Sequence, residues 1–382
     1  MPINNTQSKL PQLRPNIFSH MAGVAAKYKA VNLAQGFPDF PCAPELVELL
    51  HYYAKKGVNQ YAPGHGIPAL RQQISEYLLR RDQQAYDANS DITITAGATE
   101  GLFCSIAALI RAGDEAIILE PAYDTYEPTI ELFGGVVKPV QLLAPEFKID
   151  WEQLKAAISP KTKILILNTP HNPSGTVLSA EDLQQLAEIL ADTKIIVISD
   201  EVYADMVFVP LQHHSISTIP ALKERSIVIG SFGKSFHITG WKVGFCAAPA
   251  YLTDELRKIH NLTTFSVHTP SQFALAKLMA EPKHIASVAP LYADKKSYFL
   301  DGLQGSAWQF LPSQGSYFVT ADYSAISNLN DMDFCHYLAK ERGVAAIPYS
   351  AFYKNPPENQ RLIRFCIAKE RQTLDAAINK LR

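Results

Sequence analysis

The sequence has few cysteines, and they are scattered. Five cysteines among 382 residues are odd in number and widely spaced. A disulfide framework needs an even set in a small domain, and a structural zinc site needs closely paired cysteines or histidines. The pattern fits neither of these. We interpret the cysteines as small core residues of a protein in a reducing compartment: Cys42, Cys104, Cys246, Cys335 and Cys366.

An excess of basic charge is also missing. Lys and Arg number 35 and Asp and Glu number 37, which gives a formal net charge of -2. A protein that follows a nucleic-acid backbone needs surplus cations to neutralise its phosphates. We therefore expect no nucleic-acid partner, while a compact anionic ligand stays open.

Long apolar runs are absent as well. No stretch reaches the roughly 20 apolar residues that span a bilayer, and residues 1–14 are polar with Pro2 and Pro11. We expect no signal peptide, no membrane contact and a cytoplasmic location. Apolar residues make up 47% of the chain and charged residues 19%, which is typical of a globular protein.

The chain is long enough for two domains. From Asp91 onward, short runs of Val, Ile and Leu alternate with helical segments, which predicts an α/β fold with a mainly parallel sheet covered by helices on both faces. The predicted strands cover 92–95, 116–119, 164–167, 195–199 and 226–230, another starts near Val243, and helices cover 99–110 and 181–190. We assign residues 41–280 to this large domain.

Beyond about residue 280 the pattern changes to a smaller α+β domain. Helices are expected at 284–303, at 332–342 and at the C-terminus, and strands at 308–310, 316–320, 344–347 and 362–368. The proline-rich residues 1–40 are expected to form an irregular arm. This arm and residues 281–382 together make up the small domain.

Polar residues follow four of the predicted strands where each strand ends. These segments are 97–99, 168–175, 200–203 and 231–234. In such sheets, ligands bind beyond the carboxyl ends of the strands. We therefore expect the four segments to meet in one crevice.

Two ionisable residues stand out in these segments. Lys234 follows a buried strand, and burial together with the nearby Lys242 is expected to lower the pKa of its amine, as a Schiff-base nucleophile requires. Asp200 follows another buried strand, where a carboxylate is costly unless it meets a cation. Taken alone, Lys234 can equally be an exposed turn lysine, and Asp200 can cap the following turn.

Other side chains suggest a bound anion and a flat ring. Amide groups at Ala98 and Thr99 begin a predicted helix and can hold a phosphate. Arg364 lies in an apolar run and needs a carboxylate, from either the protein or a ligand. Tyr123 can stack on a ring or be a core residue, and Asn172 is a donor fixed by a rigid turn or simply a part of that turn.

In their order along the chain, these motifs resemble the fold-type-I pyridoxal-phosphate aminotransferases of class I/II. They are Gly-Ala-Thr, Asn-Pro-Ser-Gly, Asp-Glu-Val-Tyr, Ser-Phe-Gly-Lys with Gly-Trp-Lys-Val-Gly, and Ile-Arg-Phe, and the resemblance covers nearly the whole chain. Gln-Gly-Phe-Pro-Asp-Phe at 35–40 and Asn-Gln-Tyr-Ala-Pro at 59–63 are similar to the kynurenine/glutamine transaminase branch, and closest to bacterial methionine aminotransferases.

The resemblance implies pyridoxal 5′-phosphate as cofactor and a homodimer. It also implies ping-pong transfer of the amino group of a neutral L-amino acid, methionine preferred and aromatic amino acids accepted, to a 2-oxo acid. Lys234 would be the Schiff-base lysine and proton carrier, and Asp200 would pair with the ring nitrogen. The remaining implied contacts are Tyr203, Asn172 and Tyr123 with the ring, Ala98, Thr99, Ser231, Lys242 and Tyr61 of the partner subunit with the phosphate, and Gly36, Phe37, Asn172 and Arg364 with the substrate.

The sequence departs from the aspartate-specific members of this family. Gly233 stands where they have serine or threonine, and Lys242 stands where they have arginine. Residues 262–270, where dicarboxylate-specific members place a second arginine, contain no Arg or Lys and include Phe265. We therefore expect a pocket for neutral, apolar side chains.

Three alternatives remain open. A β-lyase of the same fold would cleave cysteine S-conjugates with the same residues. A non-catalytic regulator that binds pyridoxal phosphate is disfavoured because the sequence shows no helix-turn-helix extension or basic segment. A dinucleotide oxidoreductase is disfavoured because Gly-x-Gly-x-x-Gly does not follow the first strand.

Overall fold

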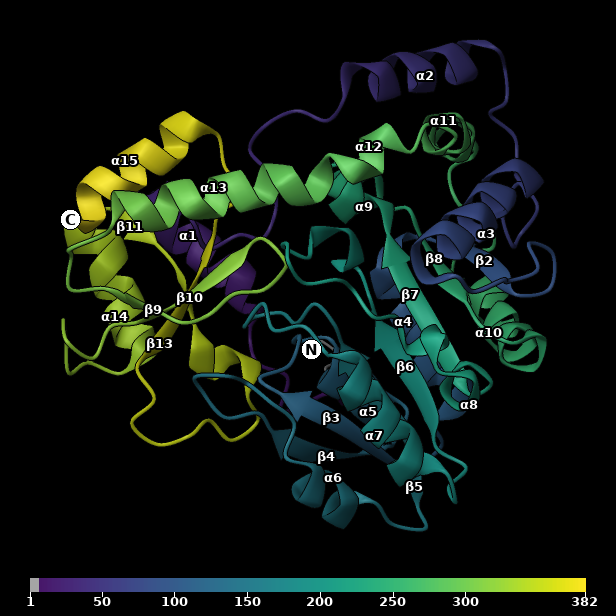
Figure 1. The fold of residues 1–382 in the computed structure, drawn as a ribbon, viewed down its shortest axis with the longest axis horizontal. Helices are drawn as coiled ribbons and strands as arrows, with labels where there is room; N and C mark the ends of the chain where they lie inside the picture. The colour runs from purple at the N-terminus through teal and green to yellow at the C-terminus, as the bar shows by residue number, and fades with distance from the viewer. Residues whose placement is uncertain (1–6) are drawn as a thin grey trace, which may run out of the picture.

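The computed structural model describes residues 7–382, which form two lobes (Figure 1). The large lobe is built on a seven-stranded sheet, in which β8 pairs antiparallel with its two neighbours and the other neighbours pair parallel. The strand order is β2 (Ile92–Thr95), β8 (Gly244–Ala247), β7 (Ser226–Ser231), β6 (Ile196–Asp200), β5 (Thr162–Asn168), β3 (Glu115–Glu120) and β4 (Val136–Gln141). The predicted mainly parallel sheet is confirmed.

Helices cover both faces of this sheet because alternate strand residues point to opposite sides. On one face, Ile164 and Ile166 of β5 pack with α4 (Gly97–Leu109), α5 (Tyr126–Leu132) and α10 (Ala250–Thr263). On the other face, Leu165 and Leu167 share a core with α3 (Pro68–Asp82), α6 (Trp151–Ala157), α7 (Ala180–Leu190), α8 (Pro220–Lys223) and α11 (Thr269–Met279).

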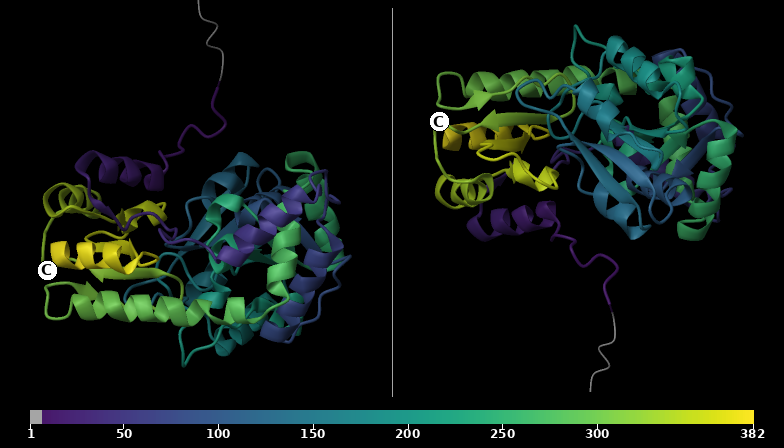
Figure 2. Two further views of the ribbon diagram at one scale, coloured as in Figure 1. Left: turned by 90° about the horizontal axis from the view of Figure 1, so that it is seen from above. Right: turned by 90° about the horizontal axis from the view of Figure 1, so that it is seen from below.

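The small lobe has a four-stranded sheet in the order β12 (Ile347–Pro348), β13 (Leu362–Cys366), β10 (Phe318–Asp322) and β9 (Gln309–Phe310). Its helices are α14 (Asp331–Tyr337), extended by the π-helical residues Leu338–Arg342, and α15 (Arg371–Leu381). The helix predicted at 284–303 is two helices, α12 (Lys283–Ala286) and α13 (Val288–Gly302), and α13 lies along this lobe (Figures 1 and 2). The strand predicted at 344–347 is likewise divided into β11 (Val344–Ala345) and β12.

The prediction of an irregular segment over residues 1–40 is wrong. The structure has α1 (Ile17–Tyr28), capped by the side chain of Asn16, and β1 (Val31–Asn32), which pairs parallel with β11. The prolines that suggested irregularity lie outside α1, and the buried Ile17, Met21 and Val24 form an apolar stripe at helical spacing. Residues 1–6 lie outside the described part of the chain.

The domain boundaries at residues 40 and 280 stay a prediction. In their support, α1 shares its core with the C-terminal lobe, whereas α2 (Pro44–Lys55) packs on α11 of the large lobe. Among the described residues, no helix combines the length and the apolar character that crossing a membrane requires.

Candidate active site

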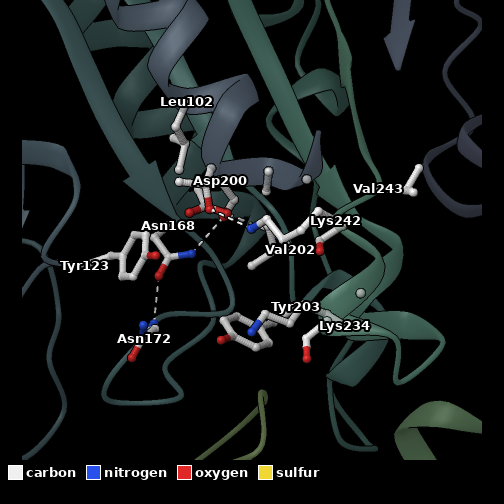
Figure 3. Close-up of a pocket in the computed structure, with 16 residues that line it drawn as sticks. Leu102, Tyr123, Asn168, Asn172, Asp200, Val202, Tyr203, Lys234, Lys242 and Val243 are labelled. Carbon is white, nitrogen blue, oxygen red and sulfur yellow. Dashed lines mark hydrogen bonds between the residues drawn. The ribbon is translucent and has the colours of Figure 1, made fainter. Parts of the chain in front are cut away.

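A cavity of about 170 Å³ lies at the carboxyl ends of the central strands (Figure 3). Its walls come from the segments that follow β2, β5, β6 and β7, so the expected convergence of four strand ends is confirmed. An apolar cavity of roughly 150 Å³ holds benzene, so this one has room for a single aromatic ring. The predicted site residues on its wall are Ala98, Thr99, Tyr123, Asn172, Asp200, Tyr203, Ser231, Lys234 and Lys242.

Lys234 lies in the short helix α9 (Phe232–Ser235), directly after β7. Its Nζ donates to the hydroxyl of Tyr317 at 2.7 Å and to the carbonyl of Gly36 at 3.4 Å. Burial lowers the pKa of Lys234 to about 8, and the charge of Arg364 acts in the same direction. The amine is therefore available as a free base close to neutral pH, and the exposed-lysine alternative is wrong.

Asp200 is the last residue of β6 and is buried at the wall of the cavity opposite Lys234 (Figure 3). Its Oδ2 accepts from the hydroxyl of Tyr126 at 2.6 Å, and its Oδ1 accepts from the amide of Val202 at 3.3 Å. Both donors are neutral, and burial raises the pKa of Asp200 to about 6 even though the bond from Tyr126 lowers it. A ligand that presents a positively charged or protonated nitrogen would stabilise this carboxylate.

The turn into α4 brings helix amides, a hydroxyl and an ammonium group together. Gly97 begins the helix with φ +75°, and a Cβ there would lie 3.2 Å from the Nζ of Lys242. The absence of that Cβ allows the ammonium group to approach the free amides of the first turn, where it donates to Thr99 Oγ1 at 3.4 Å. Helix amides, an ammonium group and a hydroxyl together suit a phosphate.

Arg364 lies in the middle of β13 with 1% of its surface exposed. Its Nη1 donates to Asn172 Oδ1 at 2.7 Å, its Nη2 donates to the carbonyl of Ala34 at 3.1 Å, and its Nε is buried without a partner. Its acceptors in the described part are thus amide and carbonyl oxygens, so a structural carboxylate partner is ruled out there. The guanidinium carbon lies 3.9 Å from the ring centre of Phe318 and 5.1 Å from that of Phe352.

The remaining predicted residues differ in their distance from the cavity. Gly36 reaches it through its carbonyl, and the ring centre of Tyr203 lies 5.4 Å from Lys234 Nζ. Phe37 is 41% exposed, and Lys369 Nζ donates to its carbonyl at 2.8 Å and lies 5.0 Å from its ring centre. Tyr61 is 82% exposed and packs edge-on against Phe265, outside the cavity of its own chain.

Two tyrosines that bond to predicted site residues were themselves not predicted. Tyr126 bonds to Asp200 and packs edge-on against Tyr123, three residues earlier, with ring centres 5.7 Å apart. Tyr317 bonds to Lys234 and donates to the carbonyl of Gly36 at 2.6 Å. Tyr126 comes three residues after Tyr123 and Tyr317 directly precedes Phe318, and no local pattern distinguishes either tyrosine from a core side chain.

Known proteins match this chain over almost all of its length. Residues 28–381 match the family described as Aminotransferase class I and II. The chain belongs to this family. The methionine aminotransferase of Escherichia coli (strain K12) is 47% identical over 377 residues, covering 98% of this chain and 97% of that protein. A kynurenine–oxoglutarate transaminase of Dictyostelium discoideum is 36% identical over 413 residues, covering 96% of this chain and 93% of that protein.

A solved structure agrees with these matches. The crystal structure of YbdL from Escherichia coli, reported with a methionine aminotransferase function, superimposes with a TM-score of 0.97 and covers 99% of both chains. The protein is therefore an aminotransferase of the kynurenine-transaminase-like branch, and the predicted fold is confirmed.

Aminotransferases of class I and II use pyridoxal 5′-phosphate, and the cavity fits this cofactor. The anion site at α4 and Lys242 suits its phosphate, and the buried Asp200 suits its ring nitrogen. Lys234, with its lowered pKa, is an amine ready to bind an aldehyde.

Proposed function

We propose that the protein is a methionine-preferring aminotransferase that also accepts aromatic amino acids and passes the amino group to a 2-oxo acid. The observation that carries the proposal is the buried Arg364, with an unpartnered Nε among phenyl rings. A guanidinium of this kind suits the α-carboxylate of a substrate, and the rings suit an apolar side chain. The identity to a methionine aminotransferase supports the same donor.

Each residue has a defined part in this reaction. Arg364, with Asn172 and the backbone of Gly36 beside it, orients the substrate by its carboxylate. When bound, the cofactor supplies a ring that withdraws electrons from the substrate Cα. Asp200 holds a proton at the ring nitrogen. Lys234 Nζ takes the proton from Cα, which its pKa of about 8 allows, and Tyr317 keeps this amine in place.

The Ala98 and Thr99 amides, Ser231 and Lys242 would hold the phosphate. Tyr203, Asn172 and Tyr123 would contact the ring. We propose that Tyr61 of the partner subunit completes the phosphate site in a homodimer. In support, Tyr61 lies far out on the surface with Leu262 and Phe265, which are 85% and 50% exposed. Residues 262–270, which include Leu262 and Phe265, contain no Arg or Lys.

We also propose that the enzyme works in the cytoplasm. All five cysteines are free, and four of them are buried. Free thiols are typical of a reducing compartment.

Steady-state rates across amino donors, with one 2-oxo acid held constant, test the proposed substrate. We expect the highest kcat/KM for methionine, lower values for aromatic amino acids and the lowest for aspartate. Aspartate outrunning methionine would contradict the proposal. Pyruvate released from a cysteine S-conjugate without any 2-oxo acid would instead identify the β-lyase.

A further inference from the structure

Behind the crevice, away from the cavity, a buried hydrogen-bond network begins at Glu201. Its Oε1 accepts from Ser199 Oγ at 3.0 Å, Ser215 Oγ at 3.0 Å and the Ile216 amide at 3.1 Å. Its Oε2 accepts from His213 Nε2 at 2.9 Å and from Arg81 Nη2 at 3.0 Å. Both oxygens of this carboxylate are therefore satisfied within the protein.

The network continues along helix α3. Arg81 donates through Nε and Nη2 to Asp82 at 2.7 and 2.6 Å, and through Nη1 to the hydroxyl of Tyr77 at 2.7 Å. The Tyr77 hydroxyl then donates to Asp205 Oδ1 at 2.7 Å. Three nitrogens of one guanidinium are thus used, and the planar fork fixes their partners in one plane.

The network ends beside the reactive lysine. Asp205 Oδ2 accepts from Ser235 Oγ at 2.5 Å, and Ser235 directly follows Lys234. At the other end, Glu201 directly follows Asp200, and Asp205 comes two residues after Tyr203. Each of these three cavity residues therefore has a close chain neighbour bonded into the same network.

The backbone that carries these residues has little regular structure of its own. Residues 204–206 form a single 3-10 turn, and α9 has only 4 residues. Such short segments make few internal hydrogen bonds, so outside contacts must set their position. The network supplies those contacts from α3, a helix of 15 residues.

We propose that Tyr77 and Arg81 are positioning residues for the amino-transfer reaction. They join Glu201 and Asp205 to Ser235. In this way they fix the segment that carries Asp200 and Tyr203 relative to the segment that carries Lys234. This inference rests on the proposed roles of those three cavity residues. A displacement of about 1 Å at reacting groups lowers rates by up to about 100-fold, so the network acts on the rate of proton transfer and leaves carboxylate binding at Arg364 unchanged.

A double-variant cycle tests the proposal. Tyr77→Phe removes the hydroxyl that links Arg81 to Asp205, and Ser235→Ala removes the last bond beside Lys234. Tyr323→Phe is the matched control, because it also removes a hydroxyl bond of a buried tyrosine, to the carbonyl of Leu329, but in the small lobe and outside this network. Ser235→Thr keeps a hydroxyl and is the conservative variant.

We expect Tyr77→Phe and Ser235→Ala each to lower kcat by about 5- to 20-fold with KM for the amino donor changed less than about twofold. The double variant should lose less than the product of the two single losses, because both break one path. Ser235→Thr should recover most of the rate, and Tyr323→Phe should behave as the unmodified enzyme.

A second readout needs no amino donor. The pH midpoint of the visible absorbance band of cofactor-loaded protein should move in Tyr77→Phe and Ser235→Ala by at least about half a pH unit, and stay in place in Tyr323→Phe. Losses that multiply independently, or an unmoved midpoint with only a lower Tm, would overturn the proposal. A wrong choice of amino donor leaves this midpoint unaffected, so failure of the proposed substrate is distinguishable.

Discussion

Asp200 and Glu201 are neighbours at the end of β6, and both are buried, but the protein treats their charges in opposite ways. Asp200 faces the cavity with neutral donors, and burial raises its pKa to about 6. Burial also opposes the charge of Glu201, but His213 and Arg81 outweigh it and hold its pKa below the usual range. Glu201 is satisfied by donors of the protein and serves the structure. Asp200 has only neutral donors and is available to a ligand.

Two arginines repeat this contrast. Arg81 is paired with Asp82 and Glu201 at 2.6 and 3.0 Å. Arg364 has no carboxylate among its hydrogen-bond partners and keeps an unpartnered Nε. A buried guanidinium without an anion is costly, so we infer that the cost is offset when a substrate carboxylate binds.

Lys234→Ala gives the largest expected effect, because it removes the side chain that carries the proton from the substrate Cα. We expect kcat to fall by at least about 1,000-fold, while cofactor binding is partly retained. Steady-state rates and equilibrium dialysis of the cofactor measure the two effects. Lys242→Ala is the comparison, since it should weaken cofactor binding more than it lowers kcat at saturating cofactor. A Lys234→Ala enzyme with normal turnover would refute the assignment.

Arg364→Lys should lower kcat/KM by about 100-fold, mostly through KM, because an ammonium group cannot replace the planar fork. Arg364→Met should lower it further and leave the Tm of the cofactor-free protein equal or higher. The opposite outcome, a large loss of Tm with little change in KM, would place Arg364 with Arg81 as a structural residue.

Asp200→Asn and Glu201→Gln should change stability with opposite signs. The raised pKa of Asp200 means that its ionised form is disfavoured in the folded protein. The stability that the neutral carboxyl group contributes is therefore lost as pH rises through about 6. In cofactor-free protein, Asp200→Asn should therefore stabilise by up to about 2 kcal/mol at pH 8 and by about half as much at pH 5, where the unfolded aspartate is already ionised.

Glu201→Gln should destabilise by about 3 kcal/mol from pH 5 to pH 8, because it removes one partner of a buried pair. The lowered pKa of Glu201 means that this stability is present above the unfolded pKa and is lost as pH falls through the folded value. Denaturant titrations at the two pH values check both variants, and shifts of the same sign would break the comparison.

Tyr126→Phe has the smallest expected effect, about fivefold in kcat/KM at neutral pH. Its hydroxyl lowers the pKa of Asp200, so its loss should raise that pKa and move the acid limb of the kcat/KM profile to higher pH. Tyr323→Phe, which removes a buried hydroxyl bond to Leu329 in the small lobe, is the control. An unmoved acid limb would show that Tyr126 does not act through Asp200.

The strands that carry the site could be predicted from the sequence because they are continuous apolar runs. The ends of these strands position Lys234 and Asp200 directly. The sequence was insufficient for β4, where Lys138 and Pro139 interrupt the apolar run of a strand at the edge of the sheet. It also failed at α1, where the prolines before the helix obscured the apolar stripe.

The partners of the site residues were not predictable for a different reason. Tyr126, Tyr317 and the Arg81 network act through contacts between segments far apart in the chain: 74, 83 and 120 residues separate Tyr126 from Asp200, Lys234 from Tyr317 and Arg81 from Glu201. Which side chain satisfies which charge depends on the packing of whole helices, and no local spacing encodes it.

The central claim is that Asp200 and Arg364, whose charges the protein does not pair, form a site for a neutral amino acid together with Lys234. Its most direct test is the absorbance spectrum of cofactor-loaded protein as methionine is added without any 2-oxo acid. We predict that the visible band is lost to one at shorter wavelength, with one equivalent of 2-oxo acid released per site, and that aspartate acts far more slowly. An unchanged spectrum with methionine, or a faster change with aspartate, would contradict the account.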